Sequence, residues 1–195
     1  MVGSLMMASS EIDICSLALL KIGANSIASF DEGTAEAEVA ANLYPIVRDA
    51  LISAHPWNFA LSQKTLAKLA IKPVADFANA FQLPSDCVHV LSAGTDGRGR
   101  GLRYRISQRR LHTNAEEVVL TYLYRANETD FPPFFDMALI AQLAAEFCIP
   151  LTDSTSRSES LRKLAEKEFR RAKLIDSQED SAPHFEDFTL IEVRG

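Results

Sequence analysis

The feature that most constrains the fold of this chain is a change of hydrophobic period near residue 62 that reverses near residue 130. On either side of this stretch, apolar residues recur every three or four positions, as on a helix with one buried face. Within it, short β-prone runs alternate with turn residues. The pattern predicts an α+β, mainly α fold. We expect an antiparallel helical bundle of residues 8–61 and 130–177, an inserted small antiparallel β subdomain of residues 62–129, and an extended C-terminal arm of residues 178–195.

The first two helices of the bundle carry signals at their ends. Ser10 and Asp13 form a capping pattern at the start of the first helix, and Gly23 is a natural stop. The second helix is expected over about 34–55. Pro45 lies inside it and lacks a backbone donor, so we expect either a kink or two shorter helices there.

The last two helices follow the β-prone stretch. The third, over 133–148, is apolar nearly all round and is expected to be the central helix, ended by Pro150. The fourth is expected over 157–175, where Ser156 and Glu159 fit a capping box.

The middle of the chain predicts strands separated by turns. The candidate strands are 65–70, 80–83, 88–93, 103–107, 110–113 and 118–124. Residues 94–101 are rich in glycine and predict a mobile hairpin loop. This loop lacks a Gly-Lys-Ser/Thr ending and no helix follows it, which argues against a nucleotide phosphate site.

Composition restricts the class of protein. Of 195 residues, 47% are hydrophobic, which is enough for a sizeable core. The formal net charge of -6 argues against a generally basic nucleic-acid coat. No uninterrupted apolar run reaches the roughly 18 to 20 residues of a membrane span, so we expect no such span. Residues 1–7 lack the basic start and apolar run of a signal peptide.

The cysteines and histidines indicate no cofactor or metal site. Cys15, Cys87 and Cys148 are far apart and form no Cys-x-x-Cys pair, so a reducing compartment is expected. Cys87 and His89 are two residues apart on an expected strand, which places them on one face like a nucleophile and its base. No orienting acid is visible, so an enzyme built on this pair is a weak alternative.

Two charged or apolar segments suggest interaction surfaces. An arginine-rich segment contains Arg98, Arg100, Arg103, Arg105, Arg109 and Arg110. These side chains suit phosphate oxygens, or acids on a neighbouring subunit, but a solvated hairpin would have the same composition. The C-terminal arm is acidic and interrupted by proline, yet it contains Phe185, Phe188, Leu190, Ile191 and Val193. So many apolar groups predict that the arm packs on another surface, for example on another subunit.

Five motifs follow one another along the chain. They are EIDICSLALLKIG at 11–23, IASFDE at 27–32, LYPIVRDAL at 43–51, HPWNF at 55–59 and FQLPSDC at 81–87. Their order, over about residues 11–177, resembles that of the tail tubular protein A family. The most specific residues of the resemblance are Tyr44, Pro45, Arg48, Asp49, Pro56, Trp57 and Phe59. For Trp57 and Phe59 we expect a hydrophobic clamp between the second helix and the β subdomain. The 94–101 loop and the arm lie outside the resemblance.

The resemblance implies a structural function. Members of that family are head-to-tail adaptors, also called connectors or gatekeepers, of short-tailed phages and prophages, and related adaptors occur in gene-transfer agents. They are not enzymes and need no cofactor. They form a ring, usually dodecameric, under the portal protein, extend the DNA channel and dock the distal tail (nozzle) protein. The implied location is the virion neck, reached from the cytoplasm of the bacterial host during assembly, without a membrane.

Two hypotheses follow for this chain. The arm would dock on the portal or on an adjacent protomer, and Arg98, Arg100 and Arg103 would face DNA in the lumen or an acidic neighbour. The alternative outside this class is a small nucleic-acid-binding module that uses the Arg-Gly loop without forming a ring.

Overall fold

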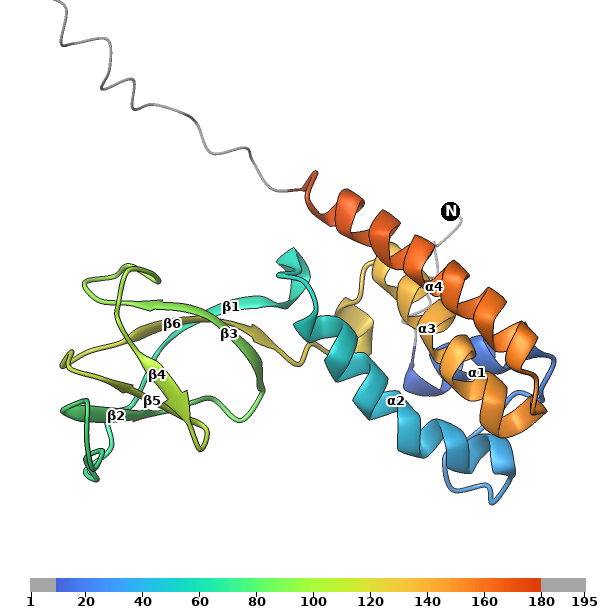
Figure 1. The fold of residues 1–195 in the computed structure, drawn as a ribbon, viewed down its shortest axis with the longest axis horizontal. Coiled ribbons are helices and arrows are strands. Elements are labelled where there is room, and N and C mark those ends of the chain that lie inside the picture. Colours follow the sequence, from blue (N-terminus) through green and yellow to red (C-terminus); the bar gives the residue numbers. More distant parts are fainter. Residues whose placement is uncertain (1–9, 180–195) are drawn as a thin grey trace, which may run out of the picture.

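The computed structural model describes residues 10–179 of the 195-residue chain. Four helices gather at one end of the molecule and two small antiparallel sheets form the other end (Figure 1). The predicted α+β, mainly α fold is therefore confirmed. Residues 180–195, which make up most of the predicted arm, lie outside the described residues.

The helices are α1 (Glu11–Ile22), α2 (Ala35–Ser53), α3 (Pro133–Thr152) and α4 (Thr155–Asp176). Helix α3 packs against all three others, because ten of its residues are buried and its apolar side chains point in every direction. The prediction of a central third helix is confirmed.

Local sequence signals account for the start and end of α1. The Ser10 hydroxyl accepts the Asp13 backbone N–H at 3.1 Å, and the Asp13 carboxylate accepts the Ser10 backbone N–H at 3.1 Å. This is the predicted reciprocal capping box. Gly23 ends the helix with a φ of 77°, a conformation that glycine adopts without steric cost.

Two predicted helix boundaries were wrong, and one of the two alternatives for the second helix is excluded. Helix α2 is one helix that includes Pro45, so the alternative of two shorter helices is excluded. Helix α3 continues through Pro150 to Thr152, because the Thr152 hydroxyl and the Asp153 N–H bond the carbonyls of the preceding turn at 2.6 and 3.1 Å. Helix α4 begins after Ser154, whose hydroxyl accepts an N–H of the first turn, and not after the predicted Ser156–Glu159 box.

The length and composition of α3 bear on the expectation that the chain has no membrane-spanning helix. Among the described residues, Pro133–Thr152 is the one helix long and apolar enough to cross a bilayer. More than half of its apolar window is buried inside the molecule, against α1, α2 and α4. A central helix of a globular core has the same composition, so this helix is weak support for a membrane span.

The strands form two three-stranded sheets. The first has the order β1 (Leu61–Thr65), β6 (Val119–Tyr124), β3 (Cys87–Gly94), and the second has the order β2 (Asn79–Gln82), β5 (Arg110–Thr113), β4 (Arg105–Ser107). All neighbouring strands are antiparallel.

The first predicted strand was placed too late in the sequence. It was expected over 65–70, but Leu61–Thr65 pairs with β6 from Leu123 to Val119. After Thr65 the chain leaves this sheet and crosses to the other, where Lys68 forms an isolated bridge with Phe81. Pairing with a strand far along the chain therefore decides where β1 lies.

Strand β6 belongs to two hydrophobic cores. Leu120 and Tyr122 are buried between the two sheets together with Phe81 and Leu111. Leu123, which points to the opposite face, is buried in the helical core. The first sheet is thus the layer through which the strands are attached to the helices.

Candidate functional site

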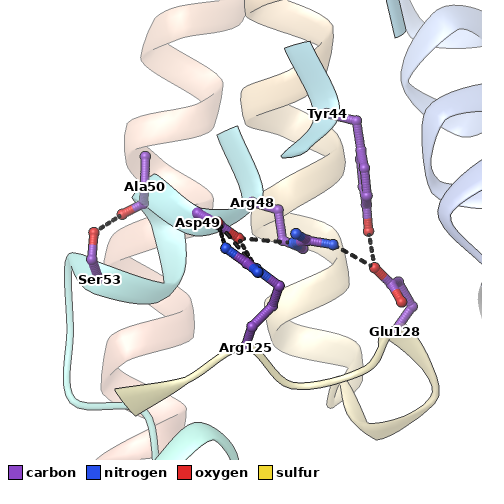
Figure 2. Close-up of polar contacts among 7 residues, drawn as sticks. All are labelled: Tyr44, Arg48, Asp49, Ala50, Ser53, Arg125 and Glu128. Atoms are coloured by element: carbon purple, nitrogen blue, oxygen red, sulfur yellow. Dashed lines mark hydrogen bonds and ion pairs between the residues drawn. The ribbon is translucent and has the colours of Figure 1, made fainter. Parts of the chain in front are cut away.

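Three residues of the resemblance project from one side of α2 toward the segment that follows β6 (Figure 2). The Tyr44 hydroxyl donates to Glu128 Oε1 at 2.7 Å, and Arg48 Nη1 donates to the same oxygen at 3.1 Å. Arg48 Nε donates to Asp49 Oδ1 at 3.0 Å. Arg125, just after β6, donates from Nε to both oxygens of Asp49 at 3.1 Å. We call these five residues the joint network.

The joint network is partly buried and its charges are balanced by contact. Burial raises the pKa of Glu128, but hydrogen bonds from Tyr44 and Arg48 outweigh it and hold that pKa below its ordinary value. Burial likewise raises the pKa of Asp49, and the bonds from Arg125 and Arg48 lower it further than burial raises it. Both carboxylates are therefore held ionised, Asp49 by the guanidinium groups of Arg48 and Arg125, and Glu128 by the guanidinium group of Arg48 and the Tyr44 hydroxyl. A satisfied polar network of this kind fixes the geometry of the side chains that form it.

Trp57 and Phe59 lie in an aromatic cluster. Trp57 is fully buried and its Nε1 donates to the Leu51 carbonyl of α2 at 3.0 Å. Its ring meets Phe135 of α3 edge-on at 5.2 Å and Phe169 of α4 at 5.8 Å. Its other ring contacts are with His55, Phe59 and Phe134, so none of its ring partners lies on a strand and the expected clamp against the β subdomain was wrong for Trp57.

Phe59 makes part of the connection to the strands. Its ring lies 4.8 Å from Phe135, while its carbonyl accepts the Tyr124 hydroxyl of β6 at 3.3 Å. The two prolines of the resemblance, Pro45 and Pro56, are exposed.

Sequence reasoning missed a second polar contact beside this cluster. Asp176, the last residue of α4, is buried, and its Oδ1 accepts the Asn58 backbone N–H at 3.0 Å. Asn58 Nδ2 donates to the Asp176 carbonyl at 2.8 Å, and His55 Nε2 lies 3.3 Å from Asp176 Oδ2. The HPWNF motif contains both partners, but nothing in the sequence points to an acid 118 residues away.

The joint network and the Asp176 contact attach the helices to the strands at two places. Arg125 and Glu128 belong to the segment that leaves β6, and Asn58 belongs to the short turn (Asn58–Ala60) that leads into β1. Both chain crossings between helices and strands are therefore tied to a helix, one to α2 and the other to α4. Contacts at two places restrict movement of the strands relative to the helices.

The arginine-rich segment does not form one cluster. Arg98 and Arg100 line an open concavity of about 970 Å³ with Gln63, Ser92 and Thr121. Arg105 instead pairs with Asp76 at 2.7 Å.

The other arginines lie apart from that concavity. Arg109 donates to the carbonyls of Pro84 and Ser85 at 2.8 and 3.3 Å. Arg103 is exposed, and Arg110 is partly buried on β5.

The 94–101 loop is held against the first sheet. The Gly99 carbonyl accepts the hydroxyls of Ser92 at 2.7 Å and Thr121 at 3.0 Å. A Cβ added to Gly94 would lie 1.9 Å from the Arg98 carbonyl oxygen, so the loop folds back closely over its own start. The predicted hairpin loop thus presents its arginines from an anchored backbone.

Cys87 and His89 do not share a face. The pairing of β3 with β6 shifts by one residue between them, which marks a β-bulge. Cys87 is buried between the sheets, whereas His89 is exposed. Burial raises the pKa of the Cys87 thiol, which disfavours the thiolate that a nucleophile needs. The expectation of one face was wrong because the bulge inserts a residue.

Comparisons with known proteins identify no family for this chain. A scan against protein-family models gives no match, and a search of curated proteins gives none either. Within residues 10–179, no group of three or more His, Cys, Asp or Glu side chains is placed to hold a metal ion. The apolar residues predicted to dock, Phe185, Phe188, Leu190, Ile191 and Val193, lie outside the described residues.

Proposed function

We propose that this chain is a structural head-to-tail adaptor of a short-tailed phage or prophage and that it is not an enzyme. In this proposal, copies form a ring under the portal protein, dodecameric as in the family that the sequence resembles. The ring extends the DNA channel and docks the distal tail (nozzle) protein. The protein acts in the neck of the virion, after assembly in the cytoplasm of the bacterial host.

The observation that carries this proposal is where the residues of the resemblance lie. Tyr44, Arg48 and Asp49 hold the segment after β6 against α2, and HPWNF ties the end of α4 to the turn before β1. The residues most specific to the resemblance therefore make structural contacts between helices and strands. A ring subunit needs such a joint, since it must present one surface to the portal and another to the tail at a constant angle.

The test is electron microscopy of the purified chain mixed with the ring of a candidate portal protein. We expect additional ring-shaped density under the portal. The Arg125→Met variant should still fold, because Arg125 is half exposed, but should give fewer complete rings because the joint is loosened. Lys21→Met, which removes an exposed charge on α1 outside the joint network, is the matched control. Portals that bind no chain at any concentration would refute the proposal.

One observation favours a second candidate function, a small nucleic-acid-binding module. Arg98, Arg100 and Arg103 are exposed, and within residues 10–179 none of them has an ion-pair partner. Exposed guanidinium groups bind phosphate oxygens with an affinity that falls steeply as salt rises. Filter binding of duplex DNA over a salt series separates this function from the adaptor. The control is the variant in which Arg98, Arg100 and Arg103 are all replaced by serine. Salt-dependent binding lost in the variant, together with no binding to the portal, would favour the module.

A further inference from the structure

An apolar groove runs between α2 and α4 with α3 as its floor. Its volume is about 460 Å³, and its apolar lining includes Leu43, Ile46, Val47 and Phe169. Ile46 is 66% exposed and lies beside the other apolar side chains of this lining, so the groove presents a contiguous apolar surface. Two carboxylates, Glu146 and Glu166, belong to the lining, and it contains no lysine or arginine. We call this feature the α2–α4 groove.

A second exposed apolar feature lies at the other end of the molecule. In the loop between β1 and β2, Ile71 is 68% exposed and Val74 is completely exposed, with Lys72 and Pro73 between them. Figure 1 shows this loop leading into β2 at the end of the strands away from the helices. We call residues 71–74 the β1–β2 knob.

The β1–β2 knob is held in place by its surroundings. Just after it, Asp76 accepts a hydrogen bond from Arg105 at 2.7 Å, and the Ala78 N–H donates to Asn114 Oδ1 at 2.9 Å. Pro73 restricts the backbone within it. An apolar tip fixed in this way loses little conformational freedom on binding.

We propose that the β1–β2 knob of one copy of this chain docks in the α2–α4 groove of a second copy. The knob offers two aliphatic side chains to an aliphatic and aromatic groove. It also places the positive charge of Lys72 opposite the carboxylates of Glu146 and Glu166. One copy cannot fill its own groove, because its strands carry the knob away from its helices (Figure 1).

Charge distinguishes this occupant from the C-terminal segment of the chain. Residues 180–195 include several apolar side chains but are acidic. They contain Asp180, Glu186, Asp187 and Glu192, and a single arginine. A groove lined by two carboxylates and no cation repels such a segment. The knob carries a lysine and no acid, so it matches the groove in charge as well as in polarity.

The contact joins two different surfaces and is therefore heterologous. Each copy keeps a free knob and a free groove after pairing, so repetition gives a ring if the rotation closes and a filament if it does not. This inference deepens the proposed function. It rests on that function only for the closure of the ring beneath a portal. The pairwise contact itself needs no portal and can be tested with the chain alone.

Disulfide trapping tests the contact. The Val74→Cys protein is mixed with the Ile46→Cys protein under mild oxidation, and the native cysteines interfere little because all three are buried. We expect the mixed disulfide to form at least about tenfold faster than with Leu20→Cys, a matched control on α1 that is 58% exposed. Lys72→Glu should remove this advantage, and Glu166→Lys in the second protein should restore it.

Five results would overturn the proposal. Equal rates with the Ile46→Cys and Leu20→Cys partners would show no specific contact. Fastest trapping between two Val74→Cys proteins would show that the knobs meet one another. Indifference to the charge of Lys72 would remove the electrostatic match. Faster trapping after deletion of residues 180–195 would assign the groove to that segment. Ring formation on the portal, with trapping absent, would leave the adaptor function intact and refute this contact alone.

Discussion

Replacing Arg48 with methionine should lower the free energy of unfolding by about 2 kcal/mol. The Arg48 side chain is 13% exposed, and its partners Asp49 and Glu128 are 28% and 20% exposed. Removing one partner of a fully buried ion pair costs about 3–5 kcal/mol, whereas an exposed pair contributes about 0–1 kcal/mol. The expected loss in the free energy of unfolding lies between these limits, because Arg125 still bonds Asp49 and Tyr44 still bonds Glu128 in the variant.

Urea denaturation followed by the fluorescence of Trp57 measures this loss directly. Trp57 is the single tryptophan of the chain and is fully buried near the joint. For a chain of this size, about 2 kcal/mol corresponds to a fall in melting temperature of roughly 4–8 °C. The matched control is Arg105→Met, which breaks an ion pair whose partners are 62% and 57% exposed. It should change stability by about 0.5 kcal/mol or less.

A double-mutant cycle makes the reasoning refutable. Arg48→Met and Glu128→Gln should couple by about 1–2 kcal/mol, because each change removes one side of the same 3.1 Å contact. Additive effects, or equal losses from Arg48→Met and Arg105→Met, would show that burial does not strengthen the joint network.

Three further predictions concern the joint network, the 94–101 loop and Cys87. The lowered pKa values of Asp49 and Glu128 add stability above about pH 4.5 that is lost as the pH falls, so urea midpoints should drop between about pH 5 and 3; a flat profile would contradict this. Gly94→Ala should cost about 1–3 kcal/mol in thermal unfolding, because the new Cβ meets the Arg98 carbonyl; a neutral change would mean that the loop moves away. The Cys87 thiol should react with maleimide only as the chain unfolds, and rapid labelling of the folded protein would revive the nucleophile hypothesis.

Local signals in the sequence were enough for part of the fold. The cap at Ser10, the stop at Gly23 and the apolar surface of α3 depend on residues within a few positions, and each prediction held. The displaced β1 and the bulge between Cys87 and His89 depend on pairing with β6, which period and propensity do not contain.

Only the α2 residues of the candidate site could be predicted from the sequence. Motif resemblance selected Tyr44, Arg48 and Asp49, but Arg125 and Glu128 are 76 and 80 residues or more away and resemble ordinary surface charges in sequence. Only the folded chain shows that these residues complete one network. The arginine-rich segment shows the reverse case. Its residues are neighbours in sequence, but the turns between β3, β4 and β5 place them apart in the structure.

The bond between Asp176 and Asn58 has a mechanical consequence. Helix α4 ends in a buried carboxylate gripped by the turn that leads into β1, so the chain beyond it departs from the seam between helices and strands. A force applied to the C-terminal end of α4 therefore acts first on the contact between α4 and the turn that leads into β1.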